Sequence, residues 1–171
     1  MKHLGTMILM LFTIAGSAQK MNKIIEDPTK NRTILINHCT REGLVSFPEM
    51  KEIYDMEYPA YQPDSTVIDS LKPLVSDLRI TIVLGTWCGD SKLQTPHFFK
   101  ILDQLSIPEK HITIISVDGN KKAENGLLDT LNIQRVPTFI FYTEDKTETG
   151  RIIERPKTTL EQDMLSILSK K

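Results

Sequence analysis

The stretch Gly85-Thr86-Trp87-Cys88-Gly89-Asp90-Ser91 lies between an apolar run, Ile80–Leu84, and a helical pattern that extends to Leu105. The unbroken run of apolar and β-branched residues predicts a strand that is buried on both faces. A cysteine at a strand-to-helix turn lies where the first N–H groups of the helix converge, and this environment favours the nucleophilic thiolate. The stretch therefore predicts a reactive cysteine, Cys88. A redox dithiol would need a second cysteine at position 91, which is a serine.

The sequence after Cys88 alternates between helical and strand patterns. This order predicts an α/β domain that is parallel in its first part and antiparallel in its final hairpin. The predicted elements are a helix over 90–105 that contains Pro96, a strand over 111–117, a short helix over 123–131, a strand over 138–142, a turn over 144–150, a returning strand over 151–154 and a last helix capped by Thr158.

Residues 19–77 predict an N-terminal, mainly helical extension that packs on this domain. Residues 19–30 are polar and indicate a loosely held arm. Ser46 begins a helical pattern with the spacing of a capping box. Asp64 or Ser65 begins a second helical pattern, which a proline interrupts.

The first 18 residues predict a signal peptide. Their mostly apolar run, Leu4–Ile14, fits the roughly 7–15 residues typical of such peptides and is shorter than the roughly 20 that span a bilayer. The small residues Gly16-Ser17-Ala18 predict cleavage after Ala18. We therefore expect an exported bacterial protein, periplasmic or secreted, with no membrane span after the signal is removed.

The composition of the 171-residue chain is that of an ordinary globular protein, with 40% hydrophobic and 25% charged residues. The formal net charge of -1 gives no basic surplus, so we expect no nucleic-acid partner. The chain has two cysteines, Cys39 and Cys88. Such a pair can form a disulfide in an oxidising compartment, and the sequence leaves open whether these two meet.

Two motifs occur in order along the chain, one at the cysteine turn and one in a later segment. They are Trp87-Cys88-Gly89-x-x-Lys92 and Ile133-x-x-Val136-Pro137-Thr138-Phe139, with Pro96 between them. Together with the order of the elements, they resemble the thioredoxin superfamily over residues 79–170. The turn also looks like that of a group of exported thioredoxin-like proteins. The resemblance implies a thioredoxin-like fold over 78–171, in which helices flank a central mixed sheet.

The resemblance also implies a substrate-binding surface around Cys88. The proline of the second motif follows a cis peptide in the family, which would turn the Val136 backbone toward Cys88 to pair with an extended substrate. Trp87 would shield one side of the sulfur, and Gly89 would let a partner backbone approach closely. The predicted substrate-binding residues are Trp87, Gly89, Asp90, Arg135, Val136, Pro137 and Thr138.

Three positions depart from the family pattern. Ser91 replaces the cysteine that releases a mixed disulfide, but its hydroxyl can donate to the Cys88 thiolate from the same helix face, so both are predicted catalytic residues. Ile82 replaces the buried acid that serves the second thiol. Arg135 replaces a small residue and would, with Lys92, place positive charge near the cleft.

These residues support two functions. In the first, a monothiol oxidoreductase or isomerase, Cys88 attacks a disulfide of an exported protein and a second thiol releases the product. In the second, the protein is a non-catalytic module that binds extended peptide at the Pro137 groove, so the sequence does not decide whether it is an enzyme. A third alternative makes Cys39 a distant resolving thiol. The expected partner is a protein substrate or redox partner that carries a thiol or a disulfide.

We expect neither a cofactor nor a metal site. A metal site needs several cysteine or histidine ligands at short spacing. His97 lies on the helix face opposite Cys88, and His38 adjoins Cys39 in a strand, where neighbours face opposite ways. The sequence also contains no glycine-rich phosphate loop.

Overall fold

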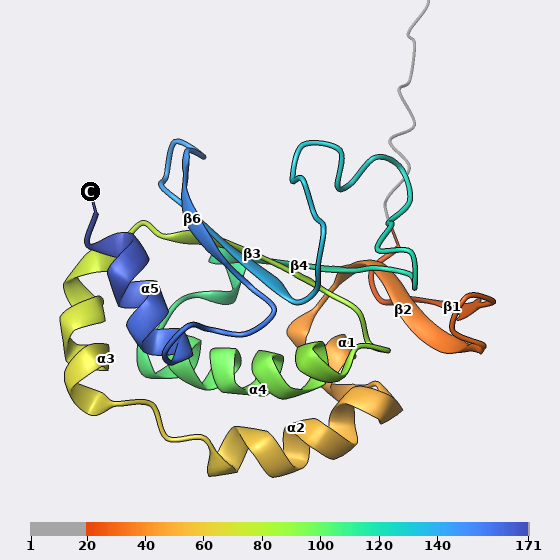
Figure 1. Ribbon diagram of the computed structural model, residues 1–171, viewed down its shortest axis with the longest axis horizontal. Coiled ribbons are helices and arrows are strands. Elements are labelled where there is room, and N and C mark those ends of the chain that lie inside the picture. Colours follow the sequence, from red (N-terminus) through yellow and green to blue (C-terminus); the bar gives the residue numbers. More distant parts are fainter. Residues whose placement is uncertain (1–19, 171) are drawn as a thin grey trace, which may run out of the picture.

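The computed structural model describes residues 20–170, so the predicted signal peptide, residues 1–18, and its cleavage site lie outside the described residues. These residues form a six-stranded sheet with the strand order β1-β2-β4-β3-β5-β6 (Figure 1). The β3 and β4 strands are parallel, and the other neighbouring pairs are antiparallel. The strands are β1 (Lys23–Asp27), β2 (Arg32–Cys39), β3 (Arg79–Leu84), β4 (Ile112–Ser116), β5 (Thr138–Tyr142) and β6 (Glu148–Ile153).

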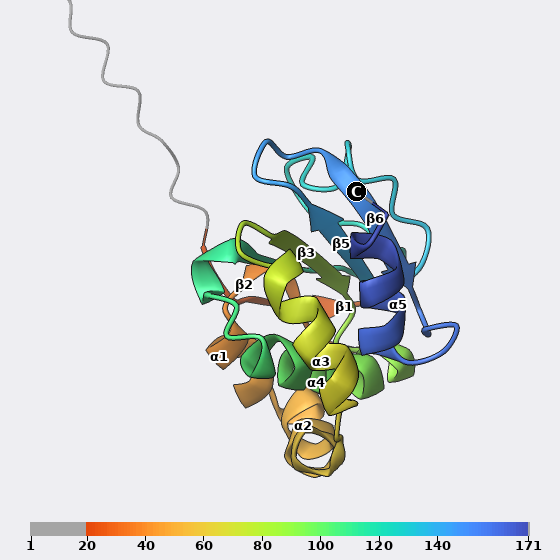
Figure 2. The same cartoon turned by 90° about the vertical axis from the view of Figure 1, so that its left-hand side faces the viewer.

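In the part of the chain that the structure describes, the α-helices cover one face of the sheet. They contribute to a single apolar core with the inward side chains of β3, β4 and β5, and Figures 1 and 2 show them together on one side. The predicted thioredoxin-like fold, a mixed sheet flanked by helices, is confirmed. The helices are α1 (Arg41–Ser46), α2 (Pro48–Ala60), α3 (Ser65–Leu71), α4 (Gly89–Gln104) and α5 (Leu160–Leu168), with short 3-10 turns at Lys72–Leu74 and Glu109–His111.

The side chains of β3 alternate between the two faces of the sheet. Ile82 is fully buried against the helices, whereas Val83 lies in a smaller cluster with Val117 and Val136 on the opposite face. Residues of the β4–β5 loop (117–137) cover this smaller cluster, and Figure 1 shows the loop in teal on the side opposite the helices. The cysteine turn follows β3 directly, so a strand buried on both faces fixes its position.

The expected helix over 123–131 must be corrected, because these residues belong to the β4–β5 loop. These residues form turns, and Asn125 and Gly126 have positive φ angles of 56° and 70°. Left-handed residues cannot continue a right-handed helix. The Glu124 carboxylate accepts a hydrogen bond from the Asn37 side chain at 2.7 Å, so contacts with β2 hold the turns in place.

The N-terminal extension is helical from α1 to α3 but begins with a β-hairpin. The expected loose arm over 19–30 is wrong for Lys23–Asp27, which forms β1. The β1–β2 hairpin adds two strands to one edge of the sheet. Backbone pairing with the apolar strand β2 orders a segment whose own composition is polar, because strand formation depends on neighbours more than on intrinsic preference.

Three helix starts test the capping predictions. Ser46 ends α1 instead of beginning a helix, and α2 begins at Pro48, where the missing N–H of proline costs nothing. Asp64 caps α3 as expected, because its side chain accepts hydrogen bonds from two N–H groups of the first turn. Thr159, not Thr158, caps α5.

Candidate active site

The sulfur of Cys88 lies where α4 meets the β4–β5 loop. Cys88 is half-buried, occupies the N-cap position of α4, and donates through its Sγ to the Val136 carbonyl oxygen at 3.3 Å. Its backbone N–H donates to the Gly85 carbonyl at 2.9 Å, which closes the turn. The Val136–Pro137 peptide bond is cis. The structure thus brings together Cys88, Val136 and Pro137 at the positive end of a helix dipole.

The Trp87 ring is held against the cysteine turn itself. Its Nε1 donates to the Val117 carbonyl at 3.0 Å. The ring lies so close to Gly85 that a Cβ at that position would be 2.7 Å from it. Gly85 is therefore needed for this packing, a role that was not among the sequence predictions. Gly89 differs, because a Cβ there would meet nothing within 4 Å, and its surroundings leave space for a partner.

The turn of the β1–β2 hairpin reaches this site. The Lys30 ammonium lies 4.2 Å from the centroid of the Trp87 ring, a cation–π contact. A Cβ on Gly119, in the β4–β5 loop, would lie 2.0 Å from Thr29 Oγ1, so the hairpin turn packs directly on that loop. Lys30 could not be predicted from the sequence, because no motif links residues so far apart in the chain.

Asp27 anchors the hairpin turn. Its carboxylate is only 2% exposed and accepts hydrogen bonds from the Gly119 N–H at 2.6 Å and from Thr29 Oγ1 at 2.7 Å. Burial would raise the pKa of Asp27, but the hydrogen bonds from Thr29 and Gly119 outweigh it and lower the pKa. The pair Asp27-Pro28 is the sequence signal that could have indicated this turn, since an Asp-Pro pair favours turn initiation.

Ser91 makes a different contact from the expected one. It is fully buried, and its Oγ accepts a hydrogen bond from the Gly85 N–H at 3.2 Å. Within residues 20–170, no hydrogen bond joins it to Cys88. This geometry makes Ser91 a brace for the turn that carries the cysteine, and its predicted catalytic role stays a prediction.

The charged residues that the sequence predicted at the site are engaged in ion pairs. Asp90 pairs with Arg155, which no sequence motif indicated, at 2.9 Å. Two other predicted charges are also paired: Lys92 lies 2.9 Å from Glu49, which also pairs with Arg32, and Arg135 lies 2.7 Å from Glu154. Glu154 offsets the charge of Arg135, whereas Lys92 shares the Glu49 carboxylate with Arg32, so the expected positive charge near the cleft stays a prediction.

The backbone around Pro137 is braced from two sides. Thr138 Oγ1 donates to the Arg135 carbonyl at 2.7 Å, inside the loop. The Glu154 N–H donates to the Pro137 carbonyl at 2.7 Å, which ties the segment to the end of β6. The predicted substrate-binding residues from Arg135 to Thr138 therefore form a fixed edge beside the Cys88 sulfur.

The second cysteine is free and remote from this chemistry. Cys39 is 4% exposed, lies on β2 opposite Ile114 of β4, and forms no disulfide with Cys88. Burial raises the pKa of the Cys39 thiol to about 12. Ile82, at the position of the acid usual in thioredoxins, is fully buried in the apolar core.

Residues 20–170 contain neither a membrane-spanning helix nor a metal-binding cluster. Each helix in that range is too short or too polar to span a bilayer. Those residues contain no group of three or more His, Cys, Asp or Glu side chains arranged to hold a metal ion.

Comparison with known proteins agrees with this architecture. A thioredoxin family model (Thioredoxin_9) matches residues 49–166, well over half of the chain, beginning within α2. A protein of unknown function from Pseudomonas aeruginosa matches with a TM-score of 0.55 and 15% identity, covering 77% of this chain and 92% of that one. An HIV epitope-scaffold matches with a TM-score of 0.52 and 13% identity, covering 72% of this chain and 84% of that one.

These structural similarities, at such low identity, show a shared fold alone. No curated protein matches the chain. The family match is different in kind, because it rests on sequence and extends across the cysteine turn and the Pro137 segment. The chain belongs to the thioredoxin family.

Proposed function

We propose that the protein carries out thiol–disulfide exchange on exported proteins with Cys88 as its single active-site cysteine. The observation that carries the proposal is the 3.3 Å contact between Cys88 Sγ and the Val136 carbonyl, at the half-buried N-cap of α4. The nucleophile thereby lies beside backbone groups that an extended peptide can pair with, and such pairing binds many sequences.

The exchange takes two steps. The Cys88 thiolate attacks one sulfur of a substrate disulfide, forms a mixed disulfide with it and releases the other sulfur as a thiolate. A second thiolate then attacks the substrate sulfur of the mixed disulfide, forms a new disulfide and releases Cys88 as a thiolate. The net reaction is an exchange without an external oxidant. It becomes isomerisation when the second thiolate belongs to the same substrate.

The structure supports an external origin for the second thiol. Ser91 cannot displace a sulfur, and Cys39 is buried with a pKa of about 12, so neither supplies a resolving thiolate. Ile82 places an apolar side chain where an acid would assist such a thiol. The third alternative, Cys39 as resolving thiol, has no support in this arrangement.

Export is the part of the proposal that rests on sequence. The pattern of residues 1–18 supports passage to the periplasm, where substrate disulfides form and persist. The alternative function, a peptide-binding module without turnover, is favoured by the open space over Gly89 beside a braced backbone edge.

Acid trapping in cells separates these alternatives. The gene, including its first 18 residues, would be expressed in a bacterium, and the periplasmic extract would be quenched with acid and examined for mixed disulfides by non-reducing mass spectrometry. Adducts should form with wild type and with the matched control Cys39→Ala but not with Cys88→Ala. If the wild-type protein neither forms adducts nor exchanges disulfides with any added thiol, the exchange function is contradicted and the peptide-binding module takes its place. A protein mass that retains residues 1–18 would contradict export.

A further inference from the structure

At the end of the sheet opposite Cys88, three strand ends form a second polar site. Arg79 begins β3 and is paired in register with Tyr142, the last residue of β5. His111 directly precedes β4, and the parallel register between Ile80 and Ile112 places it level with Arg79. These three residues therefore lie side by side, while β3 alone separates them from the cysteine turn by roughly 17 Å.

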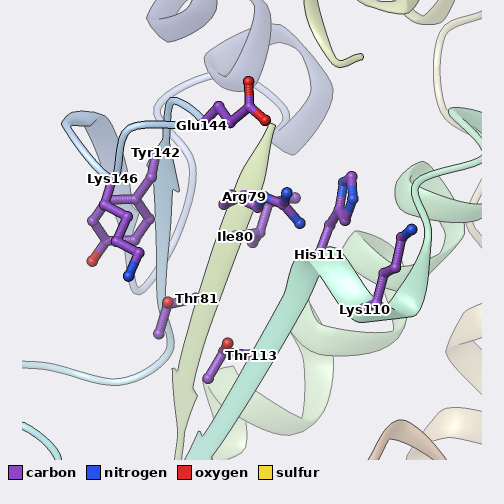
Figure 3. A pocket seen from close by; sticks show the side chains of 9 residues that line it. All are labelled: Arg79, Ile80, Thr81, Lys110, His111, Thr113, Tyr142, Glu144 and Lys146. Carbon is purple, nitrogen blue, oxygen red and sulfur yellow. The ribbon is translucent and has the colours of Figure 1, made fainter. Parts of the chain in front are cut away.

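A pocket of about 480 Å³ opens over these strand ends. Its walls include Thr81 and Thr113, which are paired across β3 and β4, and the turn of the β5–β6 hairpin (143–147). Figure 3 shows Arg79 and His111 in the middle, Lys110 beside His111, and Lys146 beside Tyr142. The volume falls within the roughly 300–1,000 Å³ range of sites that bind small molecules.

The pocket gathers positive charge that is not neutralised. Arg79, Lys110 and Lys146 line it with one carboxylate, that of Glu144, and none of the three cations forms an ion pair within residues 20–170. Arg79 is unusual among the arginines of that range, because the others are all paired: Arg32, Arg41, Arg135, Arg151 and Arg155. Like charges gathered in this way repel one another, and an anion between them removes the repulsion.

The wall of the pocket also contains a buried ring nitrogen without a partner among residues 20–170. The Nδ1 atom of His111 is inaccessible to solvent and has no hydrogen-bond partner in the described chain. Buried polar atoms are nearly always paired, because an unpaired one costs free energy. The hydroxyl groups of Thr81, Thr113 and Tyr142 add donors on the same wall.

We infer that this pocket binds a small polyanion, a molecule with several carboxylate or phosphate groups. Arg79 makes the central bidentate contact with an oxyanion, because its guanidinium presents a planar pair of donors. Lys110 and Lys146 contact further anionic groups from the two sides, and Glu144 limits the affinity by repulsion. This inference does not depend on the chemistry of Cys88.

The test is a titration of the purified ¹⁵N-labelled protein at low ionic strength, with citrate as the polycarboxylate probe and inorganic pyrophosphate as the phosphate probe. We expect the amide signals of residues 79–81, 111–113 and 142–146 to shift with saturation. The tighter-binding probe identifies the class of anion. The rate of Cys88 alkylation should stay unchanged at saturation, because the cysteine turn lies at the other end of β3.

Variants decide whether the pocket or the overall charge is responsible. Arg79→Gln and Lys146→Gln should each weaken binding roughly tenfold or more, as loss of a charge-assisted contact does. Lys157→Gln removes the same charge from an exposed site elsewhere and should change binding less than about twofold. Glu144→Gln should strengthen binding. The inference is overturned if neither probe shifts these amides at millimolar concentration, or if Lys157→Gln weakens binding as much as the pocket variants do.

Discussion

The two cysteines occupy contrasting positions, one within the sheet and one at the start of a helix. Cys88 follows the end of β3 at the N-cap of α4 and is half-buried, with its sulfur beside the Val136 carbonyl. Cys39 lies within β2, is 4% exposed and keeps its proton because burial raises its pKa to about 12. The same residue type thus lies half-exposed at a helix start in one place, where we predict a reactive nucleophile, and is a small core side chain in the other.

The β1–β2 hairpin joins these two regions physically. Its second strand carries Cys39, and its turn places Lys30 on the Trp87 ring beside Cys88. The N-terminal extension is therefore part of the surroundings of the active-site turn. Changes in the hairpin should be detectable at both cysteines.

The largest expected difference is in alkylation rate. At pH 7 a thiol with a pKa of about 12 is ionised in only about one molecule in 10⁵, and Cys39 is also buried. In the native protein, iodoacetamide should therefore modify Cys88 at least roughly 100-fold faster than Cys39, as measured by peptide mass spectrometry. In guanidinium chloride the two rates should converge. Comparable rates in the native state would remove the contrast between the two sites.

Restoring a second thiol should change the fate of the mixed disulfide. In Ser91→Cys, a thiol stands three residues along α4 from Cys88, on the same helix face. The adduct formed with oxidised glutathione should then disappear at least roughly tenfold faster than in wild type without added thiol. Ser91→Ala serves as the control and should keep the adduct. A persistent adduct in Ser91→Cys would show that position 91 cannot reach the sulfur even as cysteine.

The Asp27→Asn variant should loosen the hairpin. Loss of the charged acceptor for the Gly119 N–H and for Thr29 should lower the free energy of unfolding by about 1–3 kcal/mol. Alkylation of Cys39 should accelerate, because β2 belongs to the same hairpin. Urea unfolding and the alkylation assay measure the two effects, with Asp145→Asn, on the exposed β5–β6 turn, as the matched control.

The contribution of the Asp27 carboxylate to the free energy of unfolding should depend on pH with a definite sign. Hydrogen bonds hold the pKa of Asp27 below its usual value in the folded state, so the stabilisation is present above the unfolded pKa of about 4. It is lost as the pH falls through the folded pKa. The difference in stability between wild type and Asp27→Asn should therefore shrink in acid, and a difference that grows in acid would contradict the assignment.

The smallest effect should come from Lys30→Gln. A partly exposed cation–π contact contributes about 0.5–1 kcal/mol, so stability should fall by no more than that. Trp87 is the only tryptophan, so its fluorescence reports the contact directly. The emission should change in Lys30→Gln and stay unchanged in Lys20→Gln. Unchanged emission in both variants would mean that the hairpin turn does not contact the ring in solution.

The sequence predicted those parts of the molecule that short motifs and periodicity encode. The apolar run before Cys88 and the cap at Asp64 are local features, and both occur where expected. The β1 strand and the turns over 123–131 were predicted wrongly, because contacts between distant segments, such as that of Glu124 with Asn37, decide their conformation.

The candidate site shows the same difference between features that motifs predict and features that depend on distant contacts. The approach of Val136 to Cys88 agrees with what the family motifs implied. The contacts of Lys30 with Trp87 and of Arg155 with Asp90 join segments that no motif connects. Ser91 could be identified by its spacing, but the direction of its hydroxyl depends on the local fold of the turn at Gly85.

The most direct test of the single-cysteine account is the lifetime of the Cys88 adduct in the wild-type protein. The purified protein would be treated with excess oxidised glutathione, freed of reagent and followed by intact-mass spectrometry. We predict one glutathione adduct per molecule, located at Cys88, that persists until an external thiol is added. Spontaneous loss of the adduct with formation of a Cys39–Cys88 disulfide, or no adduct at Cys88 at all, would contradict it.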